Sequence, residues 1–171
     1  VVITPSGSSA INGTQVRAHT ATSPNAFIWQ GIIPAGVDAT NCTVVITASA
    51  STFSDAYVGY WSVPTANLNS TTAVDSDSVR VAANNTASVD ISTNSGGLII
   101  AASTTSATTP TGTSWTTGDE TYTERFDLDS SGSQHSGADA SNTAAATNTN
   151  TVTAVTSGTA VDLTVVTASW R

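Results

Sequence analysis

The chain has 171 residues, with 12 acidic side chains, four arginines and no lysine, and a formal net charge of −8 at pH 7. This balance leaves no basic surface to neutralise phosphates, so we expect no binding to nucleic acid or to anionic membranes, and no run approaches the ~20 apolar residues of a membrane-spanning helix. Charged residues are 9% of the sequence against ~25% in ordinary soluble proteins, so hydroxyl and amide side chains must make up most of the surface.

The distribution of apolar residues predicts an all-β fold. β-branched Val and Thr recur along the whole chain, and no window keeps the helical period. A mean hydropathy of +0.03 argues against disorder. Strands are expected over 26–33, 42–50, 55–63, 86–92, 97–104, 121–128, 151–156 and 161–170, with weaker candidates at 1–4 and 15–22.

Turns rich in Gly, Pro, Asn and Ser separate these segments. About eight to ten short strands punctuated in this way predict an antiparallel β-sandwich, jelly-roll-like in architecture, as one domain over 1–171. Residues 1–22 form a possible N-terminal arm or edge strand, which could anchor the chain to a neighbour. The polar stretches 67–77 and 104–117 are expected as loops.

Alternation within the strands indicates which side chains share a face. Tyr57, Gly59 and Trp61 lie on one face of their predicted strand. Val44, Ile46 and Ala48 do so in theirs, and both sets are expected to face inward. The nearly continuous apolar run 97–102 predicts a central strand covered on both faces, and 138–150 could hold a short helical turn around 144–146, although Thr and Asn weaken it.

One segment carries oxygen ligands at calcium-loop spacing. Asp127, Asp129 and Ser131 stand at positions one, three and five before a glycine. The twelfth position is Ala138, so the bidentate glutamate of such loops is missing. A plain turn after a strand explains the same pattern, and Asp75 with Asp77 is a weaker match; the sequence leaves calcium binding by Asp127 and Asp129 open and predicts no metal site.

No other cluster points to catalysis or to a cofactor. His19 and His135 have no His, Cys or Glu at zinc-ligand spacing, and neither a nucleophile elbow nor a phosphate loop is present. Cys42 is the single cysteine and is expected as a small buried residue. We therefore expect a protein that is not an enzyme. Four glycosylation sequons, at Asn12, Asn41, Asn69 and Asn84, are uninformative in a chain so rich in Asn, Ser and Thr.

The tryptophans allow a second function. Trp29, Trp61 and Trp170 lie inside strand patterns and are expected in the core or in an interface, whereas Trp115 falls in a polar stretch. An exposed tryptophan there, with loops 67–77 and 129–150, would form the site of a carbohydrate-binding or adhesin module. That alternative includes host surface glycans as partners.

A series of short motifs runs through the C-terminal half: Gly96-Gly97 before an apolar strand, Trp115, Thr-Glu-Arg-Phe-Asp ending at Asp127, and a terminal Ala-Ser-Trp ending at Trp170. Over residues 26–171 the chain resembles β-sandwich structural, decoration or appendage proteins of tailed bacteriophages from marine and environmental sources. The resemblance implies a non-enzymatic virion protein on the particle exterior: a capsid decoration protein, a head fibre or a tail-associated module. Its partners would be copies of itself and the major capsid or tail proteins.

Overall fold

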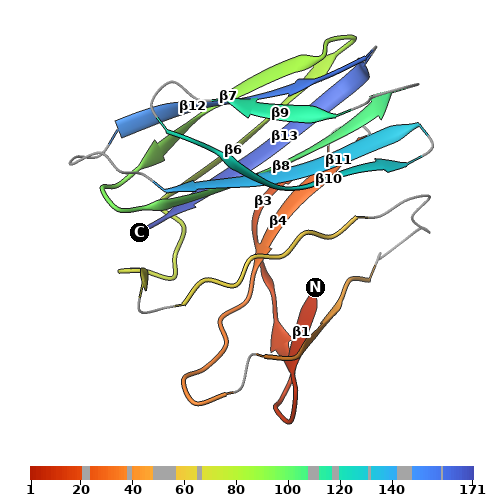
Figure 1. Cartoon of the computed structure of the whole chain (residues 1–171). Coiled ribbons are helices and arrows are strands. Elements are labelled where there is room, and N and C mark those ends of the chain that lie inside the picture. The colour runs from red at the N-terminus through yellow and green to blue at the C-terminus, as the bar shows by residue number, and fades with distance from the viewer. Residues whose placement is uncertain are drawn as a thin grey trace.

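The computed structural model describes the chain except residues 21–23, 38–39, 48–56, 65–66, 108–111, 117–119, 131, 142–147 and 159. Its regular elements are all β-strands (Figure 1), which confirms the all-β prediction. The described residues include no helix of the length and hydrophobicity needed to cross a bilayer. The strands are β1 (Val2–Pro5), β2 (Ile11–Asn12), β3 (Thr14–His19), β4 (Ala26–Gln30), β5 (Cys42–Val45), β6 (Asp75–Ala82), β7 (Thr86–Thr93), β8 (Leu98–Ala107), β9 (Thr113–Thr116), β10 (Thr123–Ser130), β11 (Ser133–Ser141), β12 (Asn148–Thr156) and β13 (Ala160–Trp170).

The last eight strands build the sandwich. One sheet has the order β10-β11-β8-β13-β6 and the facing sheet has the order β7-β12-β9, with every pair antiparallel. The pairs are nested, because β6 joins β13, β7 joins β12 and β8 joins β11, as in a long hairpin rolled up on itself. This is a jelly-roll arrangement. It departs from full nesting at one place, where β10 pairs with β11 instead of β9.

Alternate side chains of both sheets fill the space between them. Ile91 and Val152 from the three-stranded sheet meet Ile99, Leu163 and Val165 from the five-stranded sheet, and all five are fully buried. Trp115 and Tyr122 pack at the margin of this core. The interleaved apolar faces are the main source of the sandwich's stability.

A second core lies on the opposite face of the five-stranded sheet. The hairpin β3–β4 covers this face and buries Ala26 and Ile28 against Ile100, Val166 and Trp170. Strands β8 and β13 are therefore enclosed on both sides, which confirms the central strand expected over 97–102.

The remaining strands form a small N-terminal sheet of order β2-β1-β5. Figure 1 shows it below the sandwich, connected to it through β3 and β4. Ile3 of β1 packs against Gly31, just after β4. Over its described part, the segment expected as an arm or edge strand thus pairs within the chain, and β2 is an edge strand of this sheet.

Several sequence-based boundaries were wrong. The described part of the chain contains thirteen strands where eight to ten were expected, and β6, β9 and β11 use polar stretches that were expected as loops or not assigned. β8 continues to Ala107, since β11 and β13 pair with it along its length. Residues 57–63, expected as a strand, form no ladder with the described strands. The helical turn expected at 144–146 lies outside the described residues.

Candidate functional site

Strand β5, at one edge of the N-terminal sheet, is exposed along its whole length. All four residues of β5 are exposed, including Cys42, which was expected to be buried. Val44, Val45 and Ile46 keep 40%, 47% and 41% of their surface exposed, so the expected inward face of Val44 and Ile46 is not buried within the chain; Ala48 lies outside the described residues. β5 pairs with β1 on one side, and none of the other described strands pairs with its second side.

The edges of the five-stranded sheet differ from β5 in charge. β10 carries Glu124, Arg125, Asp127 and Asp129, and β6 carries two aspartates and an arginine. Charged side chains on an edge strand discourage pairing with another chain. β5 carries none. The uncharged edges β4 and β9 also differ from β5, because each places part of its surface against a core.

Three of the four arginines are engaged in ion pairs within the chain. Among the described ion pairs, Arg17 meets Asp77 at 2.9 Å, Arg80 meets Asp162 at 2.8 Å, and Arg125 holds Asp139. Only Arg171, at the end of the chain, stands outside these pairs. Contacts between copies would therefore depend on apolar burial and on hydrogen bonds rather than on ion pairs.

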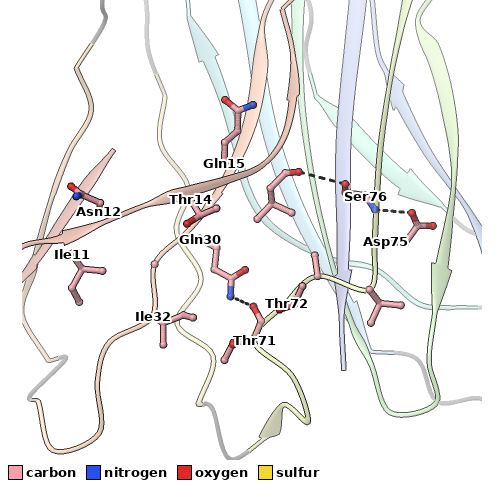
Figure 2. A pocket seen from close by; sticks show the side chains of 14 residues that line it. Ile11, Asn12, Thr14, Gln15, Gln30, Ile32, Thr71, Thr72, Asp75 and Ser76 are labelled. Atoms are coloured by element: carbon pink, nitrogen blue, oxygen red, sulfur yellow. Dashed lines mark hydrogen bonds between the residues drawn. The ribbon is translucent and has the colours of Figure 1, made fainter.

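A surface groove of about 670 Å³ lies between β2, the start of β3, the end of β4 and residues 71–76. Figure 2 shows that Gln30, Thr71 and Thr72 lie in its centre. The Gln30 side chain is fixed at both ends: its oxygen accepts from the Trp170 indole N–H at 3.1 Å and its amide donates to the Thr71 carbonyl. This groove, here called the surface groove, was not predicted, because its walls combine residues 11–16 and 30–32 with residues 71–76, which are distant in the sequence.

Trp29 was expected either in the core or in an interface, and the structure does not place it in the core. Ala26 and Ile28 take the inward positions of β4, so Phe27 and Trp29 point outward and are 44% and 40% exposed. Trp29 stands opposite Gln15 in the β3–β4 ladder, and Gln15 lines the surface groove. Trp170 is buried as expected, and Trp61 packs against the second core.

The carbohydrate site suggested by the sequence would bring Trp115 together with residues 67–77, and the structure keeps these apart. This residue lies on β9, packs against the first core and donates its indole N–H to the Ser136 hydroxyl at 2.7 Å. It pairs with Ala154, towards the sandwich end where β13 begins, whereas Ser70 and Val74 bond to the backbone at the end of β13. The segments 67–77 and Trp115 thus lie at opposite ends of the sandwich.

The segment with calcium-loop spacing, for which the sequence left calcium binding open, runs from β10 into its antiparallel partner β11. Asp127 uses one carboxylate oxygen to accept from the Gln134 amide at 2.6 Å and the other to accept from the Thr113 backbone N–H at 2.8 Å. The residue therefore serves as a hydrogen-bond acceptor between strands. Within the described residues, no group of three His, Cys, Asp or Glu side chains is arranged to hold a metal ion.

Residues 57–64, here called the strap, cross the outer face of β10 and β11. Tyr57 stacks on His135 with ring centroids 4.2 Å apart, and the Phe126 ring lies against Gly59. Trp61 donates to Asp139 at 3.0 Å. Hydrogen bonds donated by Arg125 and Trp61 lower the pKa of the Asp139 carboxyl, and the bond from Arg125 has the larger effect. Tyr57, Gly59 and Trp61 thus share one face, as predicted, but the described residues of the strap do not form the predicted strand.

Among the described residues, the two histidines lie on different strands. His19 lies on β3 and His135 lies under the strap on β11. Burial raises the pKa of Tyr122, with Glu120 adding to the effect, which keeps its hydroxyl protonated. A comparison of the chain with family models, with curated proteins and with solved structures finds no match.

Proposed function

We propose that this protein is a non-enzymatic structural component of a bacteriophage virion that assembles with copies of itself on the particle exterior. The observation that carries the proposal is the β5 edge, which is uncharged, apolar and exposed along its whole length. A long-lived monomer with such an edge risks uncontrolled pairing, and a symmetric assembly covers it.

The occupant we propose for this edge is β5 of a second copy. An edge without charge adds no local charge repulsion when it meets its own copy, although the two chains, each with a net charge of −8, still repel each other at longer range. Two antiparallel β5 strands related by a twofold axis would join two N-terminal sheets into one of six strands and bring the exposed valines together. The pairing needs none of the arginines, three of which are bound within the chain.

The sequence supports the location on a virion, and the fold is compatible with it. Jelly rolls serve as viral capsid domains and also as lectins, so the architecture by itself decides neither. The motifs from Gly96 to Trp170 resemble those of tailed-phage structural proteins. A Ser/Thr/Asn-rich surface with few charges suits a densely packed exterior protein.

Quantitative mass spectrometry of purified particles tests the location. The proposal predicts many copies of the chain per virion, in a fixed ratio to the major capsid or tail protein. If the gene is expressed in the infected host but the purified particles contain none of the chain, the proposal is contradicted. Treatment of intact virions with a membrane-impermeant maleimide adds a structural control, because a paired β5 should protect Cys42 relative to the detergent-released protein.

A further inference from the structure

The surface groove has the chemistry of a carbohydrate site. We infer that it binds a neutral oligosaccharide, a function that goes beyond assembly and does not rest on it. The groove and the β5 edge lie on opposite sides of β1, since β2 lines the groove and the sheet order is β2-β1-β5. A variant in one place therefore leaves the other intact.

The charge of the lining selects an uncharged ligand. No lysine or arginine lines the groove, and Asp75 is its single acidic residue. Both oxygens of that carboxylate are occupied, because they accept from the backbone N–H groups of Ser76 and Ser92 at 2.8 Å each. Nothing in the lining neutralises a sulfate, phosphate or carboxylate on a ligand, and the protein's net charge of −8 repels such groups.

Side-chain amides supply the hydrogen bonds. The amides of Asn12 and Gln15 line the groove and have no hydrogen-bond partner in the described part of the chain. Each amide offers two donors and an acceptor, which matches a pair of adjacent sugar hydroxyls that donate and accept in the same way. Figure 2 shows the hydroxyls of Thr14, Thr71 and Thr72 in the same groove.

The floor of the groove is held in place. Gln30 is clamped between the Trp170 indole and the Thr71 carbonyl, and the Ser76 hydroxyl reaches the Val16 carbonyl at 3.5 Å. These bonds join the covering hairpin to residues 71–76 and fix the walls before any ligand arrives. A preformed site avoids an ordering cost on binding.

An exposed aromatic side chain, Trp29, neighbours the groove although it is not part of the lining. Trp29 lies directly across the ladder from Gln15, where cross-strand Cβ atoms are typically about 5 Å apart. Its indole is 40% exposed although the residue sits in the middle of a strand. A sugar ring that bonds to Gln15 can place its apolar C–H face on this indole, which combines stacking with hydrogen bonding.

An extended peptide suits the groove less well. Strand addition needs a run of unpaired backbone, and β2, the edge strand in the wall, has only two residues. The remaining lining residues come from three separate segments, 14–16, 30–32 and 71–76. Such a lining fits a compact, hydroxyl-rich ligand better than a linear backbone.

The test is binding to an array of unsulfated, non-sialylated oligosaccharides that end in hexose, N-acetylhexosamine or 6-deoxyhexose, alongside sulfated and sialylated counterparts and extended peptides. We expect binding to a subset of the neutral glycans. Asn12→Ala and Gln15→Ala should each weaken it about tenfold, the loss of roughly one net hydrogen bond or slightly more. Trp29→Ala should weaken it at least as much.

Tyr60→Ala is the matched control, because Tyr60 is 82% exposed on the strap and lies outside the groove. It should bind like the unaltered protein, and all four variants should keep the same circular dichroism spectrum. Three results would overturn the inference: no neutral glycan bound, glycan binding unchanged in Asn12→Ala and Gln15→Ala, or peptides bound in place of glycans. Because none of these variants touches β5, a failure here leaves the assembly proposal standing.

Discussion

The Asp127 carboxylate on β10 accepts a hydrogen bond from the Thr113 backbone N–H on β9 at 2.8 Å and joins the two sheets where these two described strands form no ladder. The same carboxylate accepts from the Gln134 amide. Its loss would leave both donors without their acceptor, in a region where Gln134 is fully buried. The Asp127 side chain therefore connects β9 and β10, which full jelly-roll nesting would pair through their backbones.

Asp127→Ala should lower the free energy of unfolding by about 2 kcal/mol, because it removes two hydrogen bonds to a charged group. Asp129→Ala, two residues along on the exposed part of the same strand, should change it by no more than about 0.5 kcal/mol. Urea denaturation of both variants measures the difference. Equal effects of the two substitutions would show that Asp127 does not connect the sheets.

Removal of divalent cations should not change the melting temperature. The Asp127 oxygens already accept from N–H groups, and β10 runs through to Ser130 as a strand instead of opening into a calcium loop. Differential scanning calorimetry in EDTA and in millimolar calcium measures this. A calcium-dependent rise in melting temperature that disappears in Asp127→Asn would reverse the conclusion.

Asp139 should contribute to acid sensitivity. The Arg125 and Trp61 hydrogen bonds lower its pKa in the folded state, so the ion pair stabilises the protein above the unfolded value of about 3.9 and this contribution is lost as the pH falls through the lowered folded value. The substitution Asp139→Asn replaces this carboxyl group with an amide that does not titrate. The stability difference between the two proteins should therefore be largest near neutrality and shrink below about pH 4. A difference that stays constant in acid would contradict this assignment.

Gly137 provides room for the strap. A Cβ at this position would collide with the Phe126 ring and the Trp61 indole, both of which lie on the outer face of the β10–β11 hairpin. Gly137→Ala should cost about 1–3 kcal/mol, as overpacking does. Adding Phe126→Leu should recover part of that loss, because the smaller side chain frees space. If the double variant is as unstable as the sum of the singles, the collision is not the cause.

Salt should leave the assembly intact. Raising NaCl from about 0.05 M to about 1 M shortens the Debye length from ~14 to ~3 Å, which weakens repulsion between chains of charge −8 without removing apolar contacts. Light scattering across this range should show an unchanged or tighter oligomer. Dissociation to monomers at high salt would mean that electrostatic contacts dominate.

The fold class followed from the sequence because β-branched alternation is local. The sequence did not predict which strands lie at the edges of the sheets, because this depends on pairing with strands far away along the chain. Tyr57, Gly59 and Trp61 alternate as a strand does, yet they lie over a sheet without joining it. Thr105 looks like a loop residue but is fully buried, because β8 is paired on both sides at that point.

The candidate site was harder to predict. On β4 the larger apolar residues, Phe27 and Trp29, face outward and the smaller Ala26 and Ile28 face inward, so size gives the wrong side. The surface groove depends on Gln30 meeting Thr71, a contact across 41 residues that no motif marks. The absence of charge on β5 was visible in the sequence, although its place at the open side of a sheet was not.

The assembly claim is tested most directly by light scattering coupled to size-exclusion chromatography of Val45→Lys and Leu128→Lys. Both residues are exposed and apolar, at 47% and 43%, but Val45 lies on the uncharged β5 edge and Leu128 on the charged β10 edge. A lysine on β5 should block strand pairing, so we predict a dimer or larger assembly for the unaltered protein and for Leu128→Lys, and a folded monomer for Val45→Lys. A monomer at every concentration of the unaltered protein, or an undiminished oligomer in Val45→Lys, would contradict assembly through β5.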